Sequence, residues 1–214
     1  CLAWREEYLY FAVEVHDDAH QQRGQGERMF RGDHVELYLD LAPDRDPQRT
    51  DWGDGQVQLG FSPGTLDESR DATHRLAPET VVFWPAGAAA QGVLLAAQKT
   101  EQGYVVEAAV PWKLLQSLAR VPAQRPTAGL ALGFELAVSD TDSAEPAQEK
   151  MMTVLTSPWK RRNRTRLAPA VLAPADGKAP EIVRTIELAQ AAKIDRGKST
   201  EIRFDAPTLP AGKD

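Results

Sequence analysis

The sequence predicts an all-β domain, a sandwich or a barrel, with one short helix. Apolar and polar residues alternate with a period of two in a series of short runs along the chain. Segments rich in Gly, Pro and charged residues separate these runs at regular intervals. Residues 112–121 instead space their apolar side chains as a short helix does. About seven strands and one helical turn or two are therefore expected.

Two runs define the strand pattern. Residues 32–40 carry Val35, Leu37 and Leu39 at alternate positions, and residues 8–18 alternate in the same way. Each run is expected to form a strand that is buried on one face. Both runs end in carboxylates, and the connection between them is rich in Gly, Gln and charge. Polar loops that follow core strands often carry the binding site of a β scaffold.

The same alternation predicts the remaining strands, at residues 57–61, 80–84, 93–100, 104–112, 130–140 and 151–156. The connection between the third and fourth of these is short and contains Gly, so the two are expected to form a hairpin. Pro111 ends the fourth strand, and the helix follows it.

The composition changes towards the end of the chain. From Pro169 the sequence is rich in Ala and Pro, and two weaker strand patterns come after this stretch. We therefore expect residues 1–172 to form the sandwich, and residues 173–214 to form a linker with a β-rich appendage or the start of another module. At the other end, Cys1 runs almost directly into a strand, which favours a cut inside a domain over a lipid-bearing first residue.

The overall composition is that of an ordinary globular protein. Of the 214 residues, 42% are hydrophobic and 26% are charged, which argues against extended disorder. The net charge of −6 gives no reason to expect nucleic acid, because phosphate binding requires a clustered basic face. A single cysteine excludes an internal disulfide and a cysteine-based zinc site. No apolar segment approaches the roughly 20 residues that cross a bilayer.

Four blocks of sequence carry a resemblance when they are taken in order. They are residues 4–18, 32–40, 103–112 and 132–142. Together they resemble the family 9 carbohydrate-binding modules over residues 1 to about 172. The resemblance implies an antiparallel β-sandwich of jelly-roll type, with structural calcium and a sugar slot between aromatic side chains. The first block normally comes second in that family, so the family's opening strand is expected to be missing.

Tryptophans near loops are the candidates for sugar binding. Flat rings can cover the C–H face of a pyranose, while charged or amide side chains bind its hydroxyls. Trp52, Trp84 and Trp159 are the ring candidates, and Arg161 and Asn163 are the polar candidates. The alternative is that these rings seal the edge of the sandwich. Trp4 and Trp112 occupy core positions of the family, so they are expected to be structural.

Paired acids follow two of the predicted strands. Asp17 and Asp18 form one pair, and Asp140 and Asp142 form the other. Calcium takes roughly six to eight oxygen ligands, several of them carboxylates. Both pairs resemble the metal-binding regions of the family and are the candidate Ca²⁺ ligands. Acids in solvated turns are the alternative, since Asp favours turns for backbone reasons.

Enzymatic motifs do not stand out in this sequence. It contains no nucleophile elbow, no His-Glu-x-x-His pair and no phosphate loop. Glu36 and Glu107 could act as a glycosidase pair only if they met in space, and both lie within regular strand patterns. We therefore predict that the chain is not itself an enzyme, although it could be appended to a glycoside hydrolase.

The most favoured function is a non-catalytic carbohydrate-binding module. The expected partner is an oligo- or polysaccharide, and the expected source is a bacterial secreted, periplasmic or cell-surface protein. Two alternatives stay open at this point. One is a structural domain that docks a neighbouring surface or outer-membrane protein. The other is a haem-binding electron-transfer domain, for which the possible iron ligands are Met29, Met151, Met152, His16 and His34.

Overall fold

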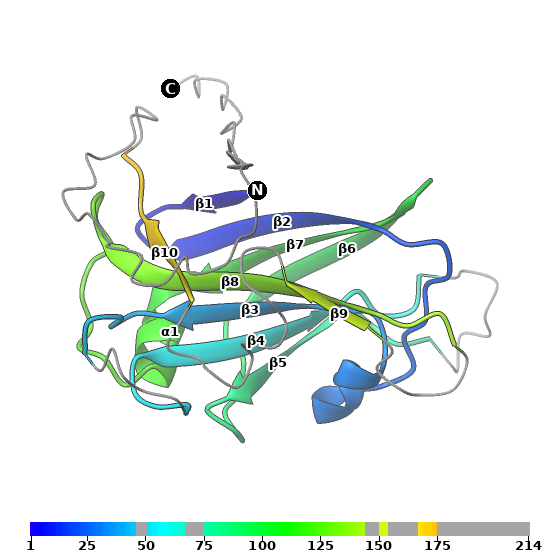
Figure 1. Cartoon of the computed structure of the whole chain (residues 1–214), viewed down its shortest axis with the longest axis horizontal. Coiled ribbons are helices and arrows are strands. Elements are labelled where there is room, and N and C mark those ends of the chain that lie inside the picture. Colours follow the sequence, from blue (N-terminus) through cyan, green and yellow to red (C-terminus); the bar gives the residue numbers. More distant parts are fainter. Residues whose placement is uncertain (46–50, 67–74, 144–149, 154–166, 175–214) are drawn as a thin grey trace, which may run out of the picture.

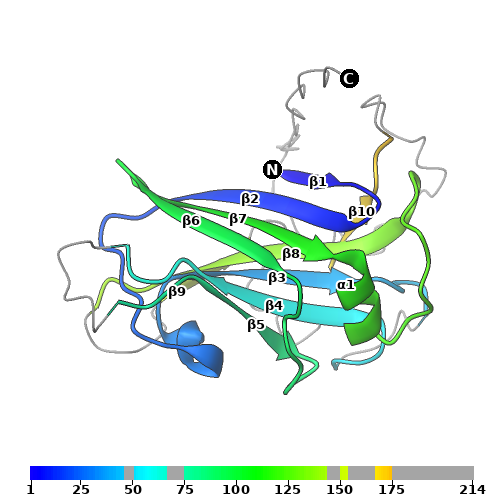
Figure 2. The ribbon, with the colours of Figure 1, turned by 180° about the vertical axis from the view of Figure 1, so that it is seen from behind.

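The computed structural model describes residues 1–45, 51–66, 75–143, 150–153 and 167–174. Two antiparallel β-sheets face each other in this part of the chain, with a short α-helix at one end and a 3-10 helix at the other (Figures 1 and 2). This arrangement confirms the predicted all-β sandwich with one short helix. Within the same residues, no helix is both long and apolar enough to cross a membrane.

The smaller sheet has four strands in the order β1-β2-β7-β6. Their bounds are β1 (Leu2–Trp4), β2 (Tyr8–His16), β6 (Leu94–Thr100) and β7 (Gly103–Pro111). The last two form the predicted hairpin, in which Thr100 pairs with Gly103. Arg5 N–H donates to the carbonyl of Tyr8 at 2.9 Å. This turn joins β1 to β2, and β1 folds back to pair with β2.

The larger sheet has six strands, with β3 at its centre. The order is β10-β8-β3-β4-β5, and β9 also pairs with β8. The strands are β3 (His34–Asp40), β4 (Gln56–Ser62), β5 (Glu79–Trp84), β8 (Ala131–Asp140), β9 (Lys150–Thr153) and β10 (Ala168–Val171). The helices are η1 (Gly26–Arg31) and α1 (Trp112–Leu118).

The core lies between the two sheets and uses the alternating apolar residues of both. Leu37, Leu59 and Phe61 come from the larger sheet and are fully buried. The ring of Phe11, from the smaller sheet, meets the ring of Phe61 edge-on at 4.6 Å. Trp112 seals one end of the core, where its indole N–H donates to the carbonyl of Arg5 at 2.9 Å. Its predicted structural role is therefore confirmed.

Two features differ from the sequence-based expectation. The first is β3, which is buried on both faces rather than one. On its polar face, the carboxylate of Glu36 contacts His34 and accepts a hydrogen bond from Tyr38. The second is β10, which forms at the start of the Ala/Pro-rich stretch, where no strand was expected. Pro169 fits there because β10 is an edge strand, where one N–H is not needed for the ladder.

Candidate functional site

Three aromatic rings, Tyr38, Trp52 and Trp84, gather on the outer face of the larger sheet and are called the aromatic cluster below. Tyr38 on β3, Gln58 on β4 and Trp84 on β5 lie side by side in register. Trp52, from the β3–β4 connection, stacks on both rings. Its centroid is 6.1 Å from that of Tyr38 and 5.8 Å from that of Trp84, with interplanar angles of 4° and 16°. Both indoles remain half-buried.

A β-bulge turns Trp84 towards this face. Leu59 pairs with Val82, but the next residue of β4, Gln58, pairs with Trp84, so that Phe83 is an extra residue in β5. Val82 points into the core and is 3% exposed. Strict alternation would send Trp84 to the same side as Val82. The bulge removes that constraint and places the indole beside Trp52.

A buried carboxylate, Glu36, holds Tyr38 and Gln58 in position. Its Oε2 accepts hydrogen bonds from the hydroxyl of Tyr38 and from the amide of Gln58, the latter at 3.0 Å. Its Oε1 lies 3.1 Å from Nε2 of His34. Burial alone would raise the pKa of Glu36, but the hydrogen bonds and charge of its partners outweigh burial and lower this pKa. Glu36 therefore stays ionised and fixes the positions of Tyr38 and Gln58.

The Glu36 network predicts a loss of stability in acid. Since the folded-state pKa of Glu36 lies below its ordinary value of 4.5, its contribution is present above that pH and is lost as pH falls through the folded-state pKa. We expect Glu36→Gln to lower the free energy of unfolding at pH 7 by about 1–3 kcal/mol. As the pH falls below about 5, the free energy of unfolding of the variant should decrease less steeply than that of the wild type. Urea unfolding at several pH values measures this difference.

Glu107→Gln is the matched control for this prediction, because Glu107 is exposed on β7. It should behave like the wild type at every pH. If Glu36→Gln retained the full acid dependence of the wild type, Glu36 would not be the group responsible.

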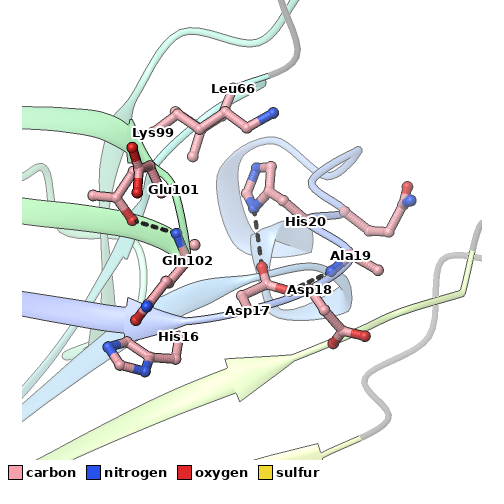
Figure 3. A pocket seen from close by; sticks show the side chains of 12 residues that line it. His16, Asp17, Asp18, Ala19, His20, Leu66, Lys99, Glu101 and Gln102 are labelled. Carbon is pink, nitrogen blue, oxygen red and sulfur yellow. Dashed lines mark hydrogen bonds and ion pairs between the residues drawn. The ribbon is translucent and has the colours of Figure 1, made fainter.

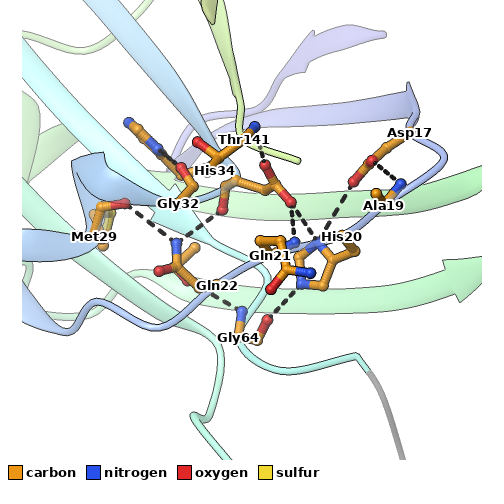
Figure 4. A network of polar contacts seen from close by, with 12 residues as sticks. Asp17, Ala19, His20, Gln21, Gln22, Met29, Gly32, His34, Gly64 and Thr141 are labelled. Carbon is orange, nitrogen blue, oxygen red and sulfur yellow. Dashed lines mark hydrogen bonds and ion pairs between the residues drawn. The ribbon is translucent and has the colours of Figure 1, made fainter. Parts of the chain in front are cut away.

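A second polar cluster lies at the other end of β3, where strands from both sheets finish. Asp17 follows β2, Asp33 precedes β3, and His20 lies between them in the chain. Figure 4 shows the side chains of His20 and Asp17 close together. Nδ1 of His20 is 3.1 Å from Oδ2 of Asp33 and 3.6 Å from Oδ2 of Asp17. Backbone N–H groups of Gln21 and Thr141 donate to the carboxylate of Asp33. These three side chains are called the His20 cluster below.

A pocket of about 760 Å³ opens onto the His20 cluster (Figure 3). Its described lining includes His16, Asp18, Lys99 and Glu101 but no Trp, Tyr or Phe. A sugar ring would find no flat apolar surface there, so the aromatic cluster is the better site for stacking. The pocket instead gives solvent and ions access to a set of carboxylates.

Comparison with known proteins places the chain in a family. Residues 2–164 match the family described as carbohydrate family 9 binding domain-like. The chain belongs to this family. The match confirms the resemblance seen in the sequence, and family 9 modules are non-catalytic carbohydrate-binding domains. Among curated proteins, no sequence matches this family 9 domain.

Two solved structures share the fold of this family 9 domain. Both are family 9 carbohydrate-binding modules from Caldicellulosiruptor kristjanssonii, one in complex with cellotriose and one with glucose. The cellotriose complex is 16% identical, with a TM-score of 0.58, and the alignment covers 84% of this chain and 77% of that one. The glucose complex is 17% identical, with the same TM-score, and the alignment covers 84% and 78%.

The structure brings together some of the predicted sugar ligands of this family 9 domain. Trp52 and Trp84 meet in the aromatic cluster. The other predicted sugar ligands, Trp159, Arg161 and Asn163, lie outside the described residues. Sequence reasoning missed Tyr38 and Gln58, although the alternation in β3 and β4 could have shown that both leave the core.

The predicted metal ligands also converge in part. Asp17, Asp18 and Asp142 can each bring one carboxylate oxygen within 4.8 Å of the others. Burial raises the pKa of Asp17, and the negative charges of Asp33 and Asp140 raise this pKa further. Asp140 is the last residue of β8. The sequence analysis did not select His20 or Asp33.

The imagined glycosidase pair is separated by the fold. Glu36 points outward from the larger sheet with its oxygens engaged, and Glu107 is exposed on the smaller sheet. Since packed sheets are about 10 Å apart, side chains on the two outer faces are farther apart than the two carboxylates of a glycosidase. They cannot act on one bond.

The haem alternative gains nothing from the comparisons or from the geometry. Both ring nitrogens of His34 contact acceptors, at Gly32 and Glu36. Met29 is fully buried. Met152 is exposed on β9 and His16 is exposed at the end of β2, while the side chain of Met151 lies outside the described residues.

Proposed function

We propose that this family 9 domain binds glucose-containing oligo- or polysaccharides on the aromatic cluster. The observation that carries the proposal is the stacking of Trp52 on Tyr38 and Trp84 around the amide of Gln58. Rings of this kind cover the C–H face of a pyranose. The modules of similar fold that bind cellotriose and glucose support glucose as the sugar class.

The polar groups of the site have separate roles in this proposal. The amide nitrogen of Gln58 donates to Glu36 and contacts the Tyr38 hydroxyl at 3.3 Å, which fixes the orientation of the amide. Within the described part of the chain, the amide oxygen of Gln58 makes no hydrogen bond and can accept one from a sugar hydroxyl. Glu36 acts as a positioning residue, because its own oxygens are engaged.

Three further ligands of this site are proposed from the sequence alone. Trp159 would add a second stacking surface, while Arg161 and Asn163 would bind sugar hydroxyls. Such a polar rim around aromatic rings is typical of sites that bind amphipathic ligands.

Calcium is proposed as a structural ion at the pocket. Asp17, Asp18 and Asp142 offer three hard oxygen donors within 4.8 Å of one another. One Ca²⁺ can span this separation, because its oxygen ligands lie about 2.3–2.6 Å from the ion. Asp140 would contribute negative charge nearby. An ion there would tie the end of β2 to the segment after β8, and so stabilise the folded state by mass action.

The proposed setting is extracytoplasmic. A domain that binds glycans without cleaving them is useful beside an enzyme or a surface protein that meets polysaccharide outside the cell. We therefore propose that the domain belongs to a secreted, periplasmic or surface protein, with an enzymatic or surface domain as its neighbour.

A glycan-array screen of the purified chain tests this function. We expect binding to glucose-based oligosaccharides in calcium, weaker binding after chelation, and restoration by excess Ca²⁺. A blank array with a folded chain would contradict sugar binding and favour a docking role. Sugar binding that changes with neither chelator nor added calcium would contradict the calcium proposal and leave the sugar proposal intact.

A further inference from the structure

The hydrogen bonds of His20 define which of its ring nitrogens carries a proton. Nε2 lies 2.9 Å from the carbonyl oxygen of Gly64. A carbonyl oxygen only accepts hydrogen bonds, so Nε2 must donate. In a neutral imidazole the other nitrogen, Nδ1, then carries a lone pair. This nitrogen lies close to two carboxylates.

The surroundings of Nδ1 are negatively charged. Oxygens of Asp33 and Asp17 lie 3.1 and 3.6 Å from it, and their side chains are 1% and 4% exposed. Among the described residues, neither Nδ1 of His20 nor Oδ2 of Asp17 has a hydrogen-bond partner of good geometry. Buried polar atoms without partners are costly, so this cluster requires either a proton on Nδ1 or a cation bound between its ligand atoms. Burial lowers the pKa of His20, but its contacts with Asp33, Gly64 and Asp17 outweigh burial and raise this pKa, which shows how strongly the site favours positive charge.

Tyr104 places a further buried polar atom beside this cluster. It is fully buried, and its hydroxyl has no hydrogen-bond partner in the part of the chain that the structure describes. Its ring meets the ring of His20 edge-on at 5.3 Å. Burial is the main cause of its raised pKa, and the charges of Asp33, Asp17 and Asp140 raise this pKa further. The hydroxyl therefore lies within the field of the same carboxylates.

His34 shows what a completed histidine site looks like in this protein. Its two nitrogens also contact acceptors, but only one of these is a carboxylate. That carboxylate, Glu36, receives additional hydrogen bonds from Tyr38 and Gln58. Among the described residues, no buried side-chain nitrogen or oxygen of His34, Glu36 or Tyr38 is left without a partner. Burying a histidine in this protein therefore does not by itself leave its ring nitrogens without partners.

We propose that Asp17, His20 and Asp33 bind a divalent transition-metal ion of the zinc class, with the hydroxyl of Tyr104 as a fourth ligand or as the partner of a bound water. Ligands of tetrahedral zinc lie about 2.0–2.2 Å from the metal, and hence about 3.3–3.5 Å from each other. The observed separations of 3.1 and 3.6 Å from Nδ1 bracket that range. An imidazole ligand favours zinc over calcium or magnesium.

The groups around these three ligands are those of an oriented metal site. His20 donates its remaining N–H to a backbone carbonyl, which is the usual partner of a metal-bound histidine. Backbone N–H groups of Ala19 and Thr141 donate to Asp17 and Asp33 at 2.8 Å and hold both carboxylates in place. The adjoining pocket gives the ion a route from solvent.

The zinc site and the proposed calcium site share one residue, Asp17, but they are otherwise separable. His20 and Asp33 belong only to the first group, whereas Asp18 and Asp142 belong only to the second. The zinc proposal does not depend on sugar binding, because the aromatic cluster lies at the other end of β3.

Zn²⁺ titration of the full chain by calorimetry tests the proposal, after metal removal and in a Cys1→Ser background that lacks the exposed thiol. We expect one Zn²⁺ per chain. His20→Gln should weaken its affinity at least tenfold, because an amide replaces the nitrogen ligand while still able to donate to Gly64. His16→Gln, which alters an exposed histidine of the same pocket, should leave the affinity unchanged.

A second measurement needs no variant in the cluster. Co²⁺ bound by one nitrogen and several oxygens in four-coordinate geometry gives visible absorption bands, and the ¹⁵N resonances of His20 should shift on addition of Zn²⁺. Absence of both signals in the folded wild type would overturn the proposal and leave His20 as a protonated partner of two carboxylates. Equal Zn²⁺ affinity of wild type and a folded His20→Gln variant would also overturn it.

Discussion

Replacing Trp52 with alanine is expected to weaken binding of cello-oligosaccharides about 30-fold, equivalent to about 2 kcal/mol. The indole of Trp52 contacts both other rings of the aromatic cluster. Its removal would delete one stacking surface and free the side chain of Trp84 to move. Trp52→Phe retains a ring and should lose less affinity. Calorimetric titration with cellotriose measures both effects.

Trp4→Ala is the control for this experiment. Trp4 is also half-buried, but it lies on β1 in the smaller sheet, and its indole N–H donates to the carbonyl of Ala173 at 2.8 Å. Its loss should leave sugar affinity unchanged. Circular dichroism would establish that all variants are folded. Unchanged affinity in folded Trp52→Ala would show that the aromatic cluster has a structural role only.

The second large effect is expected in the core, where Phe61→Ala should lower the free energy of unfolding by about 3–5 kcal/mol. Phe61 is fully buried on β4, and its ring packs edge-on against Phe11 of the opposite sheet. The variant therefore opens a cavity between the sheets. Since domains are stable by only about 5–15 kcal/mol, a large shift of the urea midpoint should result.

Leu94→Ala is the matched control for the core variant. Leu94 lies on the edge strand β6 and is 61% exposed. Its truncation should change stability by no more than about 0.5 kcal/mol. Equal losses in the two variants would mean that contacts across the sandwich do not dominate its stability.

The fold could be predicted from the sequence because local pattern and burial agree. Val35, Leu37 and Leu39 alternate in the chain, and all three are fully buried between the sheets. The hairpin of β6 and β7 was equally accessible, because a short Gly-containing connection leaves few other arrangements. What the pattern could not show was the cover over the polar face of β3. The contacts on that face come from Gln58 of β4 and from Trp52 in the β3–β4 connection.

The candidate sites were harder to predict, for two physical reasons. The orientation of Trp84 depends on one extra residue in β5, and a period-two pattern assigns it to the face of Val82. His20 and Asp33 are separated by a loop and a 3-10 helix, and they meet because the chain returns there, with Asp33 N–H donating to the carbonyl of Gln21 at 2.8 Å. Neither effect leaves a periodic signal in the sequence.

The bulge at Phe83 has a consequence for how such a surface can change over evolution. Because one additional residue decides which side of the sheet receives Trp84, gain or loss of a single codon could add a ring to the outer face or withdraw it. The residues that fill the interior would keep their identities and their neighbours. Related domains could thus diverge in ligand preference through changes of strand length, a kind of variation that comparisons of substituted positions alone would overlook.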